Sequence, residues 1–416
     1  MSLRPNEIQG APARKAALKL VDAVLRRGET LDQAAHAATQ GLLTYSDKAL
    51  ARALASEVLR WLVDLDTLID SAMQKPLPDD AKARAVLRLM VVGWLRLGTP
   101  PHAVVATALP LLTGGPRRLA HGVFSTLVKR DAALPAAPTL PDAVRERWGA
   151  RATAVAAGLA DPPPLDLGLR DVDQTERWVS EFGGLSLAPG HARLPRGSAV
   201  EELPGFAEGA WWVQDCAASL PARLLGAGEG KRVLDLCAAP GGKTLQLAAS
   251  GWQVTALDVS GKRLELLRTN LARTGLTAEV IVADALKWQP DATFDAILLD
   301  APCTATGTCR RHPDVLHRIG PRQIAEMAEL QAALLGRASG WLKPGGRLVY
   351  SVCSLEHEEG EPIAATCPLP LDPISGEELP AGLAPTSDGY LRTDPGMLAD
   401  KGGLDGFFIA RFRAKG

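Results

Sequence analysis

The hydrophobic positions between Ala13 and Arg130 recur at intervals of three and four residues. This spacing places apolar side chains on one face of an α-helix. Glycine and proline interrupt the pattern and separate successive runs. The runs cover residues 16–25, 31–41, 47–62, 82–97, 102–113 and 117–130. The pattern therefore predicts a compact bundle of six or seven helices.

A proline-rich segment, LPAAPTLPDA at residues 134–143, follows the helical pattern. Three prolines among small residues favour a stiff, extended linker. We therefore expect a domain boundary at this segment, with an all-helical domain over residues 1–133.

Residues 142–220 combine short strand patterns with one clear helix. LDLGLR at 165–170 is typical of a strand, and Ala210–Val213 is a second candidate. QTERWVSEFGG at 174–184 is typical of a helix that ends at glycine. We expect a small α/β subdomain over this range.

From Lys231 onward, strand and helix patterns alternate with short turns. The strand patterns are RVLDLC, QVTALDVS, AEVIVADAL, FDAILLDAPC, RLVYSVCS and DGFFIARFRA. This alternation predicts an α/β domain with a doubly wound parallel sheet over residues 221–416. Ligands of such sheets bind beyond the carboxyl ends of the strands. At or just past those ends this chain places Cys237, Asp258, Asp284, Asp300, Cys303 and Cys353.

Composition excludes several classes of protein. No stretch of about 18 apolar residues occurs, so we expect no membrane span. The N-terminus, MSLRPNEIQGAPARK, lacks the apolar core of a secretory signal. Six scattered cysteines without a CxxC pair indicate neither a disulfide framework nor a zinc site, and they favour a reducing compartment. We expect a cytoplasmic protein that binds no metal.

Charge is unevenly distributed along the chain. Residues 1–130 hold 18 Lys and Arg and 11 Asp and Glu, a net charge of +7. Because the whole chain carries −1, the remainder carries −8. A basic helical domain suggests a polyanionic partner such as RNA. The alternative is a solvated helical surface that is rich in arginine.

The stretch VLDLCAAPGGKTLQLA, residues 233–248, raises the question of which nucleotide-like ligand binds here. Gly242, Lys243 and Thr244 fit the phosphate loop of nucleoside triphosphatases, but Cys237 stands where that loop has its first glycine. Pro240 also removes a backbone N–H donor that such a loop uses. The dinucleotide pattern GxGxxG fails as well, because residues 237–242 are CAAPGG.

The acidic strand ends favour a third ligand. Asp258 lies fifteen residues after Lys243, where a carboxylate can accept hydrogen bonds from both hydroxyl groups of a ribose. Asp284, after the next strand, is placed to bind an adenine amino group. The compact turn at 238–242 suits a smaller group than pyrophosphate. This is the layout of S-adenosylmethionine-dependent enzymes, although an isolated Asp is more often a helix cap.

Several motifs together carry a resemblance to one family. They are LDLCAAPGGKT, LDVS, VADA, ILLDAPCTATGTCRRHPDV, YSVCSLEHEEGE and DGFFIARF. The chain resembles the Sun (Nol/Nop/Sun) RNA cytosine-5-methyltransferases over nearly its whole length. The resemblance implies a helical domain similar to the antitermination factor NusB, followed by a Rossmann-like methyltransferase domain. It also implies a monomer that uses S-adenosylmethionine and forms 5-methylcytosine in RNA, with small-subunit ribosomal RNA as the substrate.

The resemblance also implies roles for individual residues. Asp300 is implied in both cofactor binding and catalysis, Cys353 is implied as the nucleophile, and Cys303 is implied to assist product release. The implied cofactor-binding set is Cys237, Ala238, Ala239, Pro240, Gly241, Gly242, Lys243, Asp258, Arg263, Asp284 and Asp300. The chain departs from the family at Val352, where Thr is common, and at Gly360, where Asn is common.

Two cysteines suit the implied chemistry, because a thiolate that adds to carbon 6 of cytosine makes carbon 5 nucleophilic. The residues alone do not choose between them. A Pro-Cys pair carries the nucleophile in DNA cytosine-5-methyltransferases and would indicate Cys303, whereas the resemblance indicates Cys353. Either cysteine in isolation is more often a small buried apolar residue.

The basic segment CRRHPDVLHR, residues 309–318, lies between the catalytic strand and the long helix. Arg310, Arg311 and His312 are candidates to hold RNA phosphates near a flipped base. The alternative is a solvated run of charge. For the whole chain, two further hypotheses remain: an RNA-binding assembly factor with an idle methyltransferase domain, and a P-loop NTPase.

Overall fold

The structure, a computed structural model, describes residues 9–195, 197 and 199–416. Residue contacts divide the chain into two compact units. Unit 1 runs to Asp161 and includes the separate segment Cys309–Ile319. Unit 2 comprises Pro162–Thr308 and Gly320–Gly416. The two units are described one after the other.

Unit 1 contains helices and no strand within its described residues. Its α-helices are α1 (Ala11–Arg27), α2 (Leu31–Thr39), α3 (Tyr45–Arg60), α4 (Leu62–Ser71), α5 (Lys82–Leu95), α6 (Pro101–Ala108), α7 (Gly114–Lys129), α8 (Asp142–Trp148), α9 (Ala152–Gly158) and α14 (Val315–Arg318). The predicted helical bundle is confirmed, and α1 buries Ala13, Leu20 and Val24 on the expected face. The predicted run over 47–62 corresponds to α3, whereas α4 lies between the predicted runs and was missed.

Helices α8 and α9 pack in unit 1, although they follow the proline-rich linker. The division by packing therefore falls after Asp161, later than the boundary that the linker predicted. Buried apolar residues explain the difference, since Trp148 and Val155 anchor these short helices. A proline-rich segment marks where regular structure stops, and it does not show to which core the next helix belongs.

The segment Cys309–Ile319 is fixed to α3 by buried polar contacts within unit 1. The Arg60 guanidinium, 3% exposed, donates to the Arg310 carbonyl at 2.7 Å. His317 Nε2 donates to the Leu59 carbonyl at 2.6 Å. Arg60 is itself held by Glu57 at 2.9 Å. These hydrogen bonds join the segment to α3.

Unit 2 begins with a three-stranded antiparallel sheet in the order β2-β1-β3. The strands are β1 (Leu165–Leu169), β2 (His191–Leu194) and β3 (Trp211–Val213), and α10 (Thr175–Phe182) packs on them. Gly183 ends α10 in the left-handed conformation, as the sequence predicted. The predicted small α/β subdomain is thus confirmed as a fold, over residues 165–213.

The main sheet of unit 2 has seven strands in the order β6-β5-β4-β7-β8-β10-β9. The strands are β4 (Arg232–Leu236), β5 (Gln253–Asp258), β6 (Glu279–Val282), β7 (Phe294–Asp300), β8 (Leu342–Val352), β9 (Leu391–Thr393) and β10 (Phe407–Arg413). Strands β4 to β8 are parallel, as predicted. Strand β10 differs from the predicted parallel arrangement, because it pairs antiparallel with β8 and β9.

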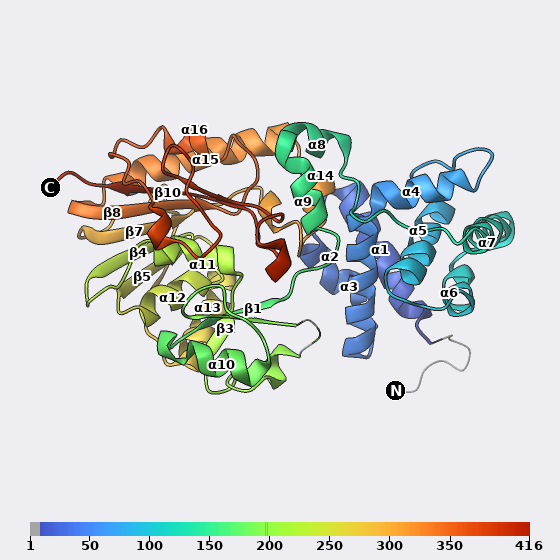
Figure 1. Cartoon of the computed structure of the whole chain (residues 1–416), viewed down its shortest axis with the longest axis horizontal. Coiled ribbons are helices and arrows are strands. Elements are labelled where there is room, and N and C mark those ends of the chain that lie inside the picture. Colours follow the sequence, from blue (N-terminus) through green and yellow to red (C-terminus); the bar gives the residue numbers. More distant parts are fainter. Residues whose placement is uncertain (1–8, 196, 198) are drawn as a thin grey trace. The chain divides into compact units, whose positions relative to one another are not determined.

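Each central strand alternates its side chains between two apolar layers. Val233 and Leu298 face α11 (Cys216–Arg223), α12 (Gly242–Ala249) and α13 (Gly261–Thr274). Leu234 and Leu299 face α15 (Pro321–Ser339) on the opposite side of the sheet (Figure 1). The strand order reverses between β4 and β7, which is where doubly wound sheets open a ligand crevice.

Candidate active site

The loop from β4 into α12 forms one wall of this crevice. Cys237 has φ of 61° and Gly241 has φ of 112°, both in the left-handed region. A Cβ at Gly241 would overlap the Leu267 side chain, so the loop requires glycine there. Burial raises the pKa of the Cys237 thiol, which keeps it protonated and supports its assignment as a loop residue. The loop ends where Gly242 starts α12, whose first N–H groups have no acceptor within the helix.

Asp258 and Arg263 lie against this loop. Strand β5 pairs in parallel with β4, so Asp258 ends beside the loop. Its Oδ2 accepts from Ala239 N–H at 3.1 Å, and its Oδ1 accepts from Ser260 N–H at 2.8 Å. Arg263 donates to the Ala239 carbonyl at 2.5 Å. The structure therefore brings together the loop and two of the predicted cofactor-binding residues.

Asp284 lies in the turn after β6. Its Oδ1 accepts from Leu286 N–H at 3.0 Å, and Lys287 lies 3.6 Å from its Oδ2. The side chain is half-exposed, so part of the carboxylate remains open to a ligand. Val282, which ends β6, and Val259, which follows β5, expose apolar surface, and the pairing of Asp258 with Val282 brings these two strand ends side by side. This strand end thus offers an acceptor together with apolar surface.

Lys243 and Asp300 pair at the centre of the crevice. Asp300 ends β7 and lies opposite Ser351 of β8. Its Oδ2 accepts from Lys243 Nζ at 2.8 Å, and its Oδ1 accepts from the Ser351 hydroxyl at 2.8 Å. Burial acts to lower the pKa of Lys243, but the Asp300 carboxylate outweighs it and raises that pKa. Lys243 is therefore an ammonium at neutral pH.

The two predicted catalytic cysteines meet just beyond β7 and β8. Cys303 Sγ lies 3.4 Å from Cys353 Sγ, although fifty residues separate them in the chain. Both are free thiols and partly buried. The contact with Cys353, together with burial, raises the pKa of Cys303 well above its usual value. Near neutral pH, Cys303 is therefore protonated.

Two buried carboxyl groups next to these residues were not predicted. Glu359 accepts hydrogen bonds from the residues that follow Cys303 and Cys353, Thr304 and Ser354. Asp235, fully buried in β4, accepts from the Thr244 hydroxyl, and burial raises its pKa to about 7. Among the described residues, Asp235 Oδ1 has no hydrogen-bond partner. Asp235 could have been found from its place two residues before the loop, whereas Glu359 lies in an acidic run that resembles solvated surface.

The predicted RNA-contacting residues separate in the structure. Arg310 is 1% exposed, which is at odds with a phosphate contact, so we withdraw that prediction. His312 is half-buried and lies 3.7 Å from Asp32; burial and the neighbouring Arg311 lower its pKa, so it is neutral at pH 7. Arg311 is exposed and stays a candidate. A charged residue in a basic run does not reveal from sequence whether it anchors the segment or faces solvent.

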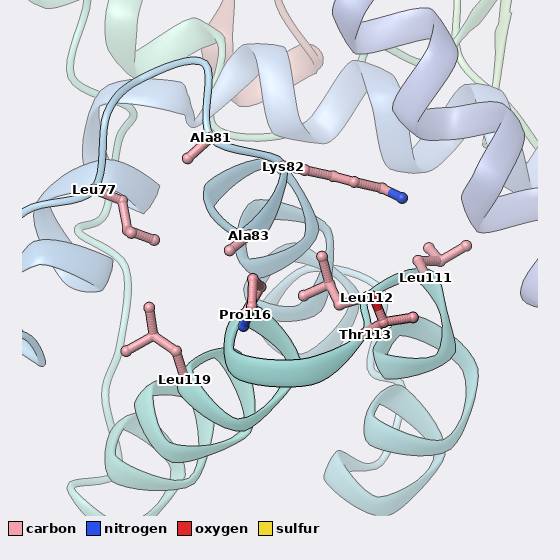
Figure 2. A pocket seen from close by; sticks show the side chains of 9 residues that line it. All are labelled: Leu77, Ala81, Lys82, Ala83, Leu111, Leu112, Thr113, Pro116 and Leu119. Atoms are coloured by element: carbon pink, nitrogen blue, oxygen red, sulfur yellow. The ribbon is translucent and has the colours of Figure 1, made fainter.

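A separate cavity in unit 1 has no thiol or carboxyl group among its lining residues. Its volume is about 450 Å³, and it is lined mainly by apolar side chains from the start of α5, the start of α7 and the loops before them, including Leu77, Leu112 and Leu119 (Figure 2). Its one titratable residue is Lys82. Across residues 9–195, 197 and 199–416, no three His, Cys, Asp or Glu side chains cluster as a metal site. Nor does any helix in that part of the chain have the length and hydropathy to cross a membrane.

Comparisons with known families match both units. The family model described as 16S rRNA methyltransferase RsmB/F matches residues 222–413, and the NusB family model matches residues 11–113. Ribosomal RNA small subunit methyltransferase B of Klebsiella pneumoniae subsp. pneumoniae is 35% identical over 434 residues, covering 96% of this chain and 97% of that protein.

Solved structures agree on the fold. The crystal structure of PH0851 superposes with a TM-score of 0.71 at 22% identity, over 99% of both chains. A methyltransferase homologue from Pyrococcus horikoshii gives a TM-score of 0.55 at 29% identity, over 66% of this chain and 93% of that one.

The fold and the site define an S-adenosylmethionine-dependent RNA methyltransferase with a Rossmann-like catalytic fold and a NusB-like helical domain. The chain belongs to the RsmB/F family of 16S rRNA methyltransferases. This membership overturns the phosphate-loop hypothesis. The structure supplies the physical reason, since Lys243, which a phosphate loop would direct at a nucleotide, donates to Asp300.

Proposed function

We propose that the protein forms 5-methylcytosine in small-subunit ribosomal RNA through a covalent adduct between Cys353 and the target base. The observation that carries this proposal is the 3.4 Å contact between the sulfur atoms of Cys303 and Cys353. The pair lies beyond the ends of β7 and β8, where Asp300 ends its strand. Two thiols at one place suit a reaction in which one bond to the base is made and later broken.

The two cysteines act at opposite ends of the reaction. The Cys353 thiolate adds to carbon 6 of cytosine, and the electron pair of the 5,6 double bond moves toward carbon 5. After carbon 5 has gained its methyl group, its proton must leave to a base, and Cys303 is placed to relay it by releasing its own proton to solvent as it takes the proton from carbon 5. Loss of that proton restores the double bond and expels the Cys353 thiolate. The raised pKa of Cys303 supports this division, because a protonated thiol is a poor attacking group.

Asp300 holds the base during the addition. Because Lys243 and Ser351 both donate to Asp300, we propose that Asp300 accepts a hydrogen bond from ring N3, which takes a proton from solvent as the thiolate adds. Each carboxylate oxygen keeps a lone pair for this purpose.

The cofactor site fits S-adenosylmethionine by its donors and acceptors. The 237–242 loop and the start of α12 offer backbone N–H groups to a carboxylate, and Asp258 offers free lone pairs to ribose hydroxyls. Asp284 offers an open acceptor to the adenine amino group. Arg263 holds the loop through Ala239. When bound, S-adenosylmethionine supplies an electrophilic methyl group on its sulfonium.

Replacing the cysteines one at a time tests the proposal. Cys353→Ala should form no RNA adduct and transfer no methyl group. Cys303→Ala should still add to the base and then stall, so an adduct that survives denaturing electrophoresis should accumulate. The double variant should lose that adduct, which makes it the matched control.

Other results of these experiments would contradict the proposal. Adduct accumulation in Cys353→Ala would reverse the two roles. If neither variant forms an adduct and both still methylate RNA, methyl transfer does not proceed through cysteine. Bisulfite sequencing or mass spectrometry of the RNA product would show whether the new methyl group is on carbon 5 of cytosine.

A further inference from the structure

Glu359 is a fully buried carboxylate between the two cysteine loops. Its Oε2 accepts from Thr304 N–H at 3.0 Å and from Gln331 Nε2 at 2.8 Å. Its Oε1 accepts from the Ser354 hydroxyl at 2.8 Å and from the Thr304 hydroxyl. All of these donors are uncharged groups. The buried charge is therefore stabilised by hydrogen bonds to neutral donors.

Three of these donors belong to residues that directly follow the catalytic cysteines. Thr304 directly follows Cys303, and Ser354 directly follows Cys353. One carboxylate thus binds the residue next to each catalytic thiol. Displacing Glu359 would remove a hydrogen bond from the residue after each thiol, and the direct bond from Gly307 N–H to the Cys353 carbonyl would remain. The 3.4 Å contact between the two sulfur atoms lies between these loops.

Other buried groups hold Glu359 itself in place. The Tyr350 hydroxyl donates to the Glu359 carbonyl at 2.7 Å and to Gln331 Oε1 at 3.2 Å. Gln331, from α15, also donates to the Pro302 carbonyl at 2.8 Å. A buried polar network with satisfied members is rigid, and loss of one member leaves others unpaired. The sheet and α15 therefore fix where the carboxylate points.

We propose that Glu359 is a positioning residue that holds Cys303 and Cys353 at the separation that their reaction needs. This inference rests on the proposed function. It acts on the reaction through Thr304 and Ser354 and does not touch the base. The two cysteine loops are more than forty residues apart in the chain, and Glu359 gives them one common anchor.

The decisive variant is Glu359→Gln, which keeps the shape and replaces one acceptor oxygen by an NH₂ donor. On the Oε2 side that donor would face the Thr304 N–H and the Gln331 amide, and on the Oε1 side the Thr304 and Ser354 hydroxyls would have to turn from donating to accepting. Glu361→Gln is the matched control. It neutralises a carboxylate two residues away that pairs with Arg392 and binds neither cysteine loop.

The first measurement needs neither RNA nor cofactor. Diamide takes one hydrogen from each of two thiols, which form a disulfide while diamide becomes the hydrazine. The rate at which Cys303 and Cys353 cross-link, followed by mass spectrometry of the linked peptides, reports how well the thiols are held together. We expect Glu359→Gln to slow this rate roughly 10- to 100-fold, because small misplacements of reacting atoms have effects of that size. Glu361→Gln should cross-link at the rate of the unchanged protein.

The second measurement is methyl transfer. Glu359→Gln should lower kcat by a similar factor and leave KM for RNA and affinity for S-adenosylmethionine unchanged, because the cofactor residues are outside this network. A purely structural loss would change all of these together with the melting temperature.

Several outcomes would overturn the inference. One is cross-linking of Glu359→Gln at the rate of the unchanged protein, whatever its activity; another is no cross-link in the unchanged protein.

If Glu359→Gln does not fold, Thr304→Val tests the inference in its place, since it removes one hydroxyl donor and keeps the side-chain shape. It should show an intermediate rate, and an unchanged rate would overturn the proposal. If the unchanged protein does not methylate cytosine but its cross-linking still requires Glu359, the proposed function fails and the positioning role stands.

Discussion

Asp258 uses both carboxylate oxygens to organise the cofactor loop. It binds Ala239 N–H and Ser260 N–H and keeps lone pairs for a ligand. Asp258→Ala should therefore weaken binding of S-adenosylmethionine by about 1.5–3 kcal/mol, the usual value of hydrogen bonds to a charged group. Isothermal titration calorimetry measures this directly. Asp295→Ala is the control, because Asp295 lies near the amino end of β7 and binds Lys343. Unchanged affinity in Asp258→Ala would refute its assignment.

Asp235 couples the stability of β4 to pH. Burial raises its pKa from 3.8 to about 7, so between these values the folded protein keeps a proton that the unfolded chain has lost. The free energy of unfolding should therefore fall as pH rises through this window, by about 1.4 kcal/mol per pH unit at most. Asp235→Asn removes this titration and can still accept from Thr244.

The difference in unfolding free energy between the unchanged protein and Asp235→Asn isolates this effect. In urea denaturation at about pH 5 and about pH 8, the unfolding free energy of the variant should rise relative to that of the unchanged protein as pH rises. A difference that does not vary with pH would mean that Asp235 is ionised throughout this range.

At the scale of elements, the turn from β4 into α12 depends on Gly241. Its φ is 112°, and a Cβ there would overlap Leu267 of α13. Gly241→Ala should destabilise the protein by roughly 1–3 kcal/mol through strain and overpacking, and it should weaken cofactor binding.

Gly275→Ala, at the end of α13, is the control. Gly275 has φ of 67°, and no atom lies within 4 Å of the place that a Cβ would take, so its replacement should cost only about 1 kcal/mol and leave cofactor affinity unchanged. Thermal unfolding with and without S-adenosylmethionine separates the two effects.

The order of elements in unit 2 follows from local pattern, and so do the cofactor residues. A parallel sheet buries both faces of its strands, so apolar runs mark them clearly. The residue after each run then lies at the carboxyl edge, which is how Asp258 and Asp300 could be predicted to converge. The fourteen residues between Lys243 and Asp258 are enough for one helix and one strand, and the structure has α12 and β5 there.

Side-chain burial outside regular elements could not be predicted in the same way. Glu359 lies in LEHEEGE, which has four glutamates, and this acidic run gives no sign that two of them, Glu356 and Glu359, are buried. Its role depends on contacts with residues more than twenty-five positions away, Thr304 and Gln331. Arg310 is similar, because only the fold brings its carbonyl to Arg60. The local sequence pattern predicts which face of a helix or strand is buried, but it does not predict such long-range hydrogen bonds.

At the scale of the whole molecule, the basic surplus of residues 1–130 is a property of the surface of unit 1. Three of its buried arginines are matched by acids, since Arg84 binds Asp70, Arg88 binds Asp66 and Arg60 binds Glu57. Such pairs contribute no net charge, so the surplus lies on other residues. Residues 101–130 contain no Asp or Glu, and α7 begins and ends with exposed cations. This helix is therefore the part of unit 1 where we expect RNA phosphates to bind.

Neutralising α7 should weaken RNA binding and reduce its salt dependence. Each phosphate that the protein no longer neutralises lowers the slope of log affinity against log salt by roughly 0.7–0.9, because fewer counterions are released. The variant is Arg117→Gln, Arg118→Gln and Lys129→Gln in the full chain, and its affinity should be measured by filter binding over a range of salt. The control neutralises Lys231, Arg268 and Arg322, surface cations of unit 2 that already pair with glutamates. If the α7 variant keeps the affinity and slope of the unchanged protein, α7 does not contact the phosphate backbone. If the control alone lowers the slope, RNA binds electrostatically to unit 2.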